Sequence, residues 1–363
     1  MNAIFSRKAL FGIVVIIVIG IAGIVAWQYS GQPQKSDTQE TALKPMKLPI
    51  TIGIIKYIPP LDPYVAGLKD GMKEFGYVEG RDVTYLEESS MGNPDLSKLN
   101  AIAKKFIAQG ADILYPFPIE ASLAALQETI AAGRTDIPII AVGANAPVEQ
   151  GLVQSYKSSG NNVAAIAIDL SVTTAKKLEF LRQLSPAAKK IGVFIERKPN
   201  LTSGLMFQEL QKHAPEFGFE LVVQTIESPA PGPTAIEEVK TKINAFKPGD
   251  IDAWFHIPGG ILTLPDASNA INSATKRLKI PSLMVNGFQV QTGGLLSYGF
   301  DIYQAGRQSA IITDKIIKGV APSEIPVEFV KKNELVINLK TAQEIGVTIP
   351  QNILSIADKV IPK

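Results

Sequence analysis

The chain has 363 residues, of which 46% are hydrophobic and 19% are charged, and its formal net charge is +2. This balance argues against nucleic acid or strongly acidic partners, because both are bound through clustered positive charge. The chain contains no cysteine, which excludes a disulfide framework, thiolate chemistry and a lipid-modified cysteine.

An uncharged run from Ala9 to Trp27 directly follows two basic residues. Its 19 residues would span roughly 28 Å as a helix, close to the hydrocarbon thickness of a bilayer. The preceding basic residues predict that everything after Trp27 lies outside the cytoplasm. The run is either an uncleaved anchor or a signal peptide cleaved after Ala26; its length, Trp27 and Tyr29 favour the anchor. We therefore expect a membrane anchor or signal segment over 1–27 and a flexible polar linker over 28–47.

The remaining chain alternates short apolar runs with amphipathic segments. In its first half the predicted strands are Ile50–Ile55, Asp82–Leu86, Asp112–Tyr115 and Ile137–Val142. The predicted helices between them run from Asp62 to near Gly76, from Asn93 to Gln109, and over Ala121–Ala132.

The pattern then restarts. The strands predicted here are Val163–Ile168, Ile191–Ile195, Glu220–Thr225, Asp252–Ile257 and Ser282–Val285. The helices are Thr173–Leu184, Leu201–Ala214, Ala235–Phe246 and Asp266–Arg277. A strand, a helix and a last strand follow at Gly294–Ser297, Asp301–Lys318 and Glu334–Ile337. Two series of this kind predict an α/β protein with two doubly wound parallel-sheet lobes.

Several kinds of chemistry have no motif in this chain. It contains no phosphate-binding GxxxxGK[ST], no GxGxxG after a predicted strand and no GxSxG nucleophile elbow. Its two histidines and its acidic residues do not have the spacing of a metal site. We therefore expect no catalytic residue, no metal and no cofactor, and a protein that is not an enzyme.

The ends of the predicted strands are rich in aromatic, proline and small polar residues. Small ligands bind at the carboxyl ends of the strands in doubly wound sheets, and helices that begin there offer free N–H groups. The candidate ligand-binding residues are Tyr57, Asp62, Phe117, Pro118, Ser122, Asn145, Glu196, His256, Asn286, Phe288, Tyr298 and Asp301. Each has an alternative interpretation as an ordinary loop residue: His256 as a hydrogen-bonded structural residue, and Asp301 as the cap of the helix that it begins.

Four stretches carry a resemblance to a known family. They are DGMKEFGYVEGRDV, IPIIAVGANAPVEQGLVQSY, GGLLSYGFDIYQAGRQSA and NELVINLKTAQEIGVTIPQNILSIADKVI. In this order they resemble the ABC transporter substrate-binding proteins that include the tryptophan-type binding proteins, over about residues 50–362.

The resemblance implies a type I periplasmic-binding fold, with two lobes joined by three hinge crossings that close on a ligand. The crossings would fall near Asn161–Val163, Val285–Gly287 and Val320–Ile325. The N-terminal lobe would then comprise 48–162 and 286–321, and the C-terminal lobe 163–285 and 322–363.

The chain departs from the family pattern at three places. In the GxDYYxxG-like segment, Asp301 is retained but Ile302 replaces one aromatic residue. The loop KYIPPLDPY is shorter than in amino-acid-binding members and lacks their histidine, and HIPGG replaces their Asp-Asn segment. The two loop departures argue against tryptophan or a related amino acid as the ligand.

The resemblance implies an extracytoplasmic, periplasmic or cell-surface, solute-binding component of an ABC importer. Such a protein captures a small polar or aromatic molecule between its lobes and delivers it to a permease and its ATPase. We expect a monomer held at the cytoplasmic membrane by its N-terminal helix, with no nucleic acid partner. The alternative is a membrane-tethered ligand-binding sensory protein, which the anchor would also suit.

Overall fold

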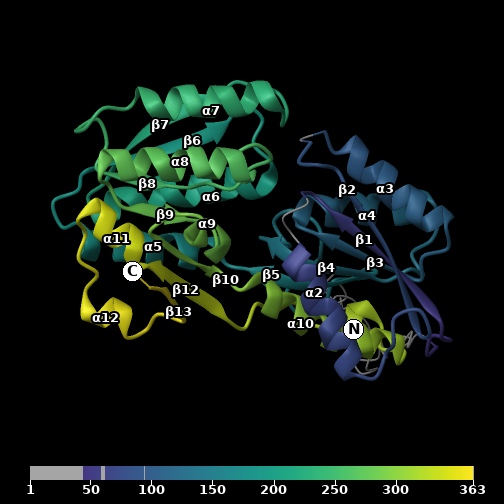
Figure 1. Cartoon of the computed structure of the whole chain (residues 1–363). Helices are drawn as coiled ribbons and strands as arrows, with labels where there is room; N and C mark the ends of the chain where they lie inside the picture. The colour runs from purple at the N-terminus through teal and green to yellow at the C-terminus, as the bar shows by residue number, and fades with distance from the viewer. Residues whose placement is uncertain (1–43, 59–61, 94, 363) are drawn as a thin grey trace, which may run out of the picture. The chain divides into compact units, whose positions relative to one another are not determined.

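The structure is a computed structural model that describes residues 44–58, 62–93 and 95–362 (Figure 1). The run Ala9–Trp27 and nearly all of the linker lie outside these residues, so the anchor, the cleavage site and the linker remain predictions. Within the described residues, no helix is long and apolar enough to span a bilayer. Two β-sheets flanked by helices confirm the predicted α/β class with two parallel-sheet lobes.

The first lobe (44–168 and 302–329) is built on a parallel sheet with the strand order β11-β5-β4-β3-β1-β2. Its strands are β1 (Ile50–Lys56), β2 (Val83–Ser89), β3 (Ile113–Phe117), β4 (Ile139–Asn145), β5 (Val163–Ile168) and β11 (Glu328–Phe329). The side chains of β3, β4 and β5 are buried on both faces, which explains their continuous apolar sequences.

Two pairs of helices cover this sheet (Figure 1). They are α2 (Asp62–Glu74) with α10 (Ile302–Ile317), and α3 (Ser97–Ala108) with α4 (Ile119–Ala131). The helices α2 and α10 pack so closely that their backbones are in contact. A Cβ atom on Gly67 would lie 2.1 Å from the Tyr303 carbonyl oxygen, and one on Gly306 would lie 2.2 Å from that of Tyr64. Only glycine permits this approach at either position.

The second lobe (170–300 and 333–361) is built on a sheet with the order β13-β12-β10-β9-β8-β6-β7, in which only β10 and β12 among the described strands pair antiparallel. Its strands are β6 (Lys190–Glu196), β7 (Glu220–Ile226), β8 (Ala253–Phe255), β9 (Ser282–Met284), β10 (Leu296–Phe300), β12 (Asn333–Asn338) and β13 (Lys359–Ile361). Its helices are α5 (Leu170–Leu184), α6 (Leu201–His213), α7 (Pro233–Ala245), α8 (Pro265–Leu278), α9 (Gly287–Gln291), α11 (Leu339–Ile345) and α12 (Gln351–Leu354). Single 3₁₀ turns follow α6 and α10, at Ala214–Phe217 and Pro322–Glu324.

The chain crosses between the sheets three times, after β5, after β10 and after β11. The predicted crossings near Asn161–Val163, Val285–Gly287 and Val320–Ile325 are wrong, because each comes one strand too early. β5 pairs with β4, and β11 pairs with β5, so both belong to the first lobe rather than the second. β10 pairs with β9 and so belongs to the second lobe. The sheet with which each strand pairs decides its lobe, and this pairing cannot be read from the sequence of the loop next to the strand.

Most predicted elements are present with ends shifted by a few residues. The helix predicted from Asn93 begins only at Ser97, because the side chains of Asn93 and Asp95 accept backbone N–H groups at 2.8 and 2.9 Å in the turn before it. The short elements β11, α9, α11, α12 and β13 are not among the predicted ones. Each has seven residues or fewer, which is too short for a clear hydrophobic period.

Candidate ligand-binding site

A cavity of about 100 Å³ lies between the two lobes, at the carboxyl ends of their strands. The first lobe contributes Tyr57 and Phe117 to its wall, and the second lobe contributes Leu170 and Met206. Among the described residues, no side chain that lines this inner chamber is charged. Its few polar groups are mainly the Asn200, Thr202, Thr263 and Asn286 side chains.

Aromatic residues form the first-lobe wall of the inner chamber. Tyr57 follows β1 and donates its hydroxyl hydrogen to the carbonyl oxygen of Gly92 at 3.2 Å. Phe117 ends β3, and its ring centroid lies 4.5 Å from that of Tyr64. Gly143 packs beneath it with φ +70°, where a Cβ atom would lie 2.5 Å from the Phe117 ring. The Phe117 ring is thus held in one position by its neighbours.

The second-lobe wall comes from two helix starts. Asn200 caps α6, and its side chain accepts the Ser203 N–H at 2.7 Å. Asn286 caps the short α9 and accepts the Gln289 N–H at 3.2 Å. Both caps use the asparagine oxygen and leave the amide group as a donor for a ligand.

A larger, open outer chamber of about 700 Å³ adjoins the inner one. The two chambers share the side chains of Thr263, Asn286, Phe300 and Ile302. Unlike the inner chamber, the outer one is lined by charges, namely Asp62, Asp301, Glu334 and Lys359. Burial and the neighbouring Asp301 carboxylate raise the pKa of Glu334.

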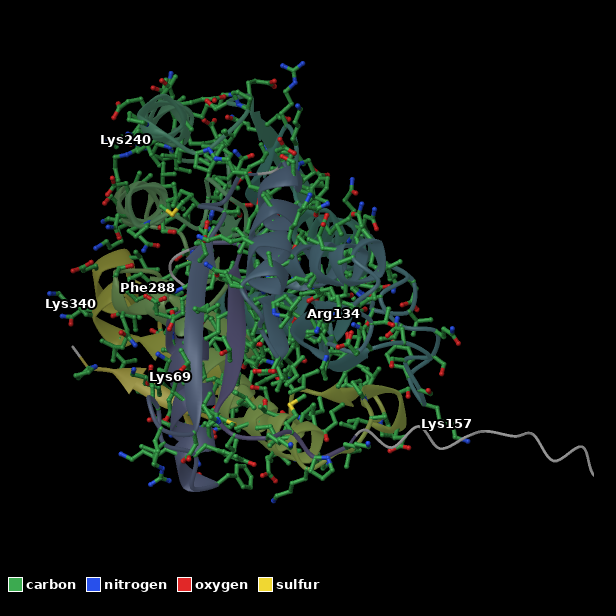
Figure 2. The ribbon with its side chains drawn as sticks, turned by 90° about the vertical axis from the view of Figure 1, so that its right-hand side faces the viewer. Lys69, Arg134, Lys157, Lys240, Phe288 and Lys340 are labelled. Carbon is green, nitrogen blue, oxygen red and sulfur yellow. The ribbon has the colours of Figure 1, made fainter. Side chains whose placement is uncertain are left out.

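The predicted site residues separate into four groups. Tyr57, Phe117 and Pro118 line the inner chamber, Asn286 lines both, and Asp62, Phe288 and Asp301 line the outer one. Phe288 is 54% exposed and reaches the surface from α9 (Figure 2). Asp62 also pairs with Lys56 at 2.7 Å, and Asp301 caps α10 by accepting the Gln304 N–H at 3.0 Å. The remaining residues line neither chamber; these are Ser122, Asn145, Glu196, His256 and Tyr298.

These five residues support the walls from behind. Glu196 Oε1 accepts the N–H groups of Ile261 and Leu262 at 2.7 and 3.0 Å, which holds the loop after β8. His256 lies 3.1 Å from the Leu262 carbonyl oxygen, and burial lowers its pKa to about 4, so the ring is neutral. The other three have protein partners of their own. Ser122 donates to the Pro118 carbonyl oxygen, Asn145 bonds to Thr202 of the opposite lobe, and Tyr298 packs against Phe180.

Part of the second-lobe wall is not among the residues predicted from the sequence, chiefly Asn200, Thr202 and Met206. They follow β6 by four to ten residues and lie at or beyond the cap of α6. A rule that marks the first residues after each strand does not reach them. The proline and asparagine before α6 were the available signal, because asparagine favours the cap position.

The lobes touch each other at the rim of the inner chamber. Across the gap, the Thr202 N–H donates to Glu120 Oε1 at 3.0 Å, and Asn145 Nδ2 donates to Thr202 Oγ1 at 3.2 Å. The loop after β2 meets the loop after β8 so closely that a Cβ atom on Gly260 would lie 2.3 Å from the Gly92 carbonyl oxygen. These contacts define a closed arrangement of the two lobes.

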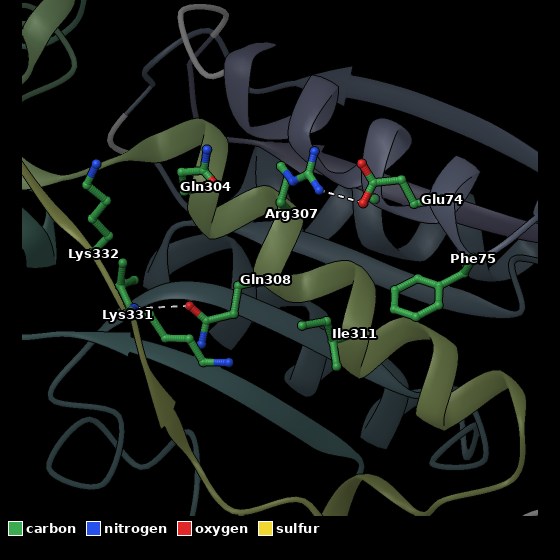
Figure 3. Close-up of a pocket in the computed structure, with 10 residues that line it drawn as sticks. Glu74, Phe75, Gln304, Arg307, Gln308, Ile311, Lys331 and Lys332 are labelled. Carbon is green, nitrogen blue, oxygen red and sulfur yellow. Dashed lines mark hydrogen bonds and ion pairs between the residues drawn. The ribbon is translucent and has the colours of Figure 1, made fainter.

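A separate groove of about 330 Å³ lies away from both chambers, where the third crossing passes α10 (Figure 3). The Lys331 N–H donates to Gln308 Oε1 at 3.1 Å, and Arg307 pairs with Glu74 of α2. None of the predicted site residues lines this groove. Its polar contacts fasten the crossing segment to the first lobe.

Two α/β lobes, three crossings and a chamber between the strand ends define a two-lobed ligand-binding protein. The chain belongs to the ABC transporter substrate binding protein family, whose sequence pattern matches residues 50–361. The resemblance found in the sequence is thereby confirmed. Proteins of this family are extracytoplasmic substrate-binding proteins.

Individual relatives extend along nearly the whole chain. A tyrosine-binding protein of Clostridioides difficile (strain R20291) is 25% identical over 339 residues, which are 93% of this chain and 92% of that protein. A crystal structure of a conserved domain protein from Vibrio cholerae is 26% identical with a TM-score of 0.75. An ABC domain from Streptococcus pneumonia in complex with L-Trp is 25% identical with a TM-score of 0.73. Each of these two matches covers 86% of this chain and 99% of the chain in the crystal structure.

Proposed function

We propose that this protein is the capture component of an ABC importer for a small molecule with an aromatic or apolar body and a charged end. An aromatic amino acid is the first candidate. The observation that carries the proposal is the pair of adjoining chambers, one without charged lining side chains and one lined by charges.

The inner chamber suits an apolar group of the size of one aromatic ring. Its volume of about 100 Å³ is of the same order as an engineered apolar cavity of about 150 Å³ that binds benzene in another protein. The rings of Tyr57, Phe117 and Phe300 would stack on such a group, while aliphatic side chains fill the rest of the wall. A charged group placed there would lose its hydration without gaining a counter-ion.

The outer chamber suits the charged end of the same molecule. The carboxylates of Asp301 and Glu334 would attract an ammonium group, and Lys359 would attract a carboxylate. The shared residues Asn286 and Thr263 offer hydrogen bonds at the boundary between the chambers. An α-amino acid with an aromatic side chain carries both kinds of group.

Two relatives support this class of ligand, since one is named for tyrosine and another is in complex with L-Trp. The loop departures seen in the sequence fall at the wall of the inner chamber, where Ile58, Pro258 and Gly259 stand. From the sequence, these departures argued against tryptophan or a related amino acid; we propose instead that they change which aromatic amino acid is preferred.

The architecture and the family support a role in capture and import. Ligand binding would select the closed arrangement, and the crossing segments would absorb the backbone change. The closed protein would dock on a permease whose ATPase drives import. A membrane anchor at Ala9–Trp27 would keep the receptor beside the permease and raise its effective concentration there.

The test is a ligand screen on the full chain in detergent, followed by thermal unfolding and calorimetry. We expect L-tyrosine, L-phenylalanine or L-tryptophan to stabilise the protein by about 2.7 kcal/mol at a hundredfold excess over Kd. Glycine, L-aspartate, glucose and adenosine should have no effect. Stabilisation by the sugar or the nucleoside alone would contradict the proposal.

A matched pair of variants locates the site. Leu170→Phe places a ring in the inner chamber and should weaken binding at least tenfold. Val172→Phe adds the same ring to the same helix at a position that is 54% exposed, and should bind like the wild type. Equal binding by both variants would move the ligand to another site.

A further inference from the structure

Glu120 lies in the first turn of α4 in the first lobe, and only 1% of the residue is exposed. Its Oε1 atom accepts the backbone N–H of Thr202 at 3.0 Å. Thr202 belongs to the first turn of α6 in the second lobe, where backbone N–H groups have no partner within the helix. Glu120 therefore caps a helix of the opposite lobe, next to the cap that Asn200 supplies from within.

The other Glu120 oxygen is left without a donor. Glu120 Oε2 is buried and unpartnered in the described structure, and so is Asn145 Oδ1. The two residues meet at Thr202, since Asn145 Nδ2 donates to Thr202 Oγ1 at 3.2 Å. No lysine, arginine or histidine among the described residues pairs with Glu120. An ionised carboxylate in this position would be a buried charge without a counter-ion, which is unfavourable.

A proton on Oε2 removes this cost and turns one unpartnered acceptor into a donor. The groups that face Glu120 are the Tyr57 hydroxyl from the end of β1, the Thr202 hydroxyl and the N–H groups at the start of α6. The hydrogen bonds from Thr202 and Leu201 oppose the effect of burial on the pKa of Glu120 and are outweighed by it. Burial raises the pKa of Tyr57, so that side chain is a neutral phenol. Burial also raises the pKa of Glu120 itself.

We propose that Glu120 is the latch of the closed form, and that it takes up a proton when the lobes close. In an open form Thr202 withdraws with its lobe, water reaches the carboxyl group, and Glu120 ionises in its ordinary range. Closure and proton uptake are then linked, so that falling pH favours the closed form. The inference rests on the lobe closure of the proposed function, but it does not depend on which ligand is bound.

The test measures lobe closure without ligand, by fluorescence energy transfer in the full chain in lipid nanodiscs. The chain has no cysteine, so Lys98→Cys and Asn269→Cys give one dye site at the rim of each lobe. We expect the ratio of closed to open protein to rise as pH falls from 8 to 5, by up to tenfold per pH unit. Above the raised pKa of Glu120 the ratio should be constant.

Glu120→Gln separates the effect of protonation from the effect of the hydrogen bond to Thr202. Glutamine keeps an oxygen for the Thr202 N–H and adds a neutral donor, so this variant should stay closed at every pH. Glu120→Ala lacks both groups, so its closed fraction should not change with pH and should be smaller than that of Glu120→Gln. The matched control, Glu128→Gln, changes a carboxylate on the same helix away from α6 and should titrate like the wild type.

Two outcomes would overturn the latch. One is a closed fraction that titrates in the same way in Glu120→Gln and in the wild type; the other is a wild-type closed fraction that does not change with pH. The failure of the proposed function looks different, because an absence of amino acid binding in the screen leaves the pH-dependent closure intact.

Discussion

At the residue scale, Lys177 is the most unusual side chain of the second lobe. It is 1% exposed, and its Nζ atom lies 4.5 Å from the centroid of the Phe255 ring. No carboxylate among the described residues pairs with it. Burial lowers its pKa from the ordinary lysine value to about 7. Lys177 therefore destabilises the fold at every pH below the pKa of the unfolded chain, and most below the pKa of the folded chain, where the buried ammonium is charged.

We predict that Lys177→Met raises the free energy of unfolding by roughly 3–5 kcal/mol at pH 6.5. The folded pKa is depressed, so the penalty is fully present below about pH 7 and fades as pH rises towards about 10.4, the unfolded value. Urea unfolding at pH 6.5, 8 and 9.5 should show that the difference in free energy of unfolding between variant and wild type becomes smaller as pH rises. Lys176→Met, at the more exposed neighbouring position, is the control. A gap that does not depend on pH would refute this account.

Individual residues also show how far a position at the end of a strand predicts a position in the wall of a chamber. Tyr57, Phe117 and Asn286 line the chambers, because a side chain at or just after the end of a parallel strand lies at the carboxyl edge of the sheet. That they contact a ligand remains a prediction. Glu196 and His256 occupy equivalent positions but support the walls from within. Successive strand residues point to opposite faces, and the sequence does not reveal which face the last residue takes.

At the scale of elements, the start of α10 joins two roles at one residue. Asp301 follows β10 at the second crossing, caps α10 through the Gln304 N–H and lines the outer chamber. The sequence left the cap and the ligand contact as alternatives, and the geometry shows the cap. Contact with a ligand amine remains a prediction.

Two substitutions separate these roles. Asp301→Asn keeps a capping oxygen but removes the charge, so stability should be nearly unchanged while affinity for an ammonium-bearing ligand falls about tenfold. Asp301→Ala should lose about 1 kcal/mol of stability as well. Chemical unfolding and calorimetry measure both quantities. If Asp301→Asn binds L-tyrosine like the wild type, Asp301 is only a cap.

The order of elements was largely predictable, whereas their division between lobes was not. Apolar runs such as β4 and β5 were evident because both of their faces are buried. The crossings depend on long-range pairing, such as that of β11 with β5, over more than 150 residues of chain. Hydrophobic period is a local property and carries no information about such partners.

At the scale of the whole molecule, closure depends on two glycines that meet across the cleft. We predict that Gly260→Ala blocks full closure, because its Cβ atom would lie 2.3 Å from the backbone oxygen of Gly92. Ligand affinity should fall at least tenfold, and small-angle scattering should show less compaction on ligand addition. Each lobe should remain as stable as before.

Gly204→Ala is the matched control for this variant. It lies within α6 of the same lobe, and a Cβ atom there meets no other atom within 4 Å. Alanine should stabilise the helix by about 1 kcal/mol and leave closure unchanged. If Gly260→Ala compacts as fully as Gly204→Ala, the rim contact does not limit closure.

The close packing of α2 against α10 also governs how the chain folds. The two helices interlock through Gly67 and Gly306, although more than 230 residues of chain separate them. The first lobe therefore cannot bury the sheet face beneath α2 and α10 until the chain up to residue 317 can fold. Its edge strand β11 follows still later in the chain. Such high contact order slows folding and keeps apolar surface exposed in the meantime. A chain that crosses a membrane from its N-terminus would thus emerge with its first lobe unfinished, and would complete that lobe only after most of the second had arrived.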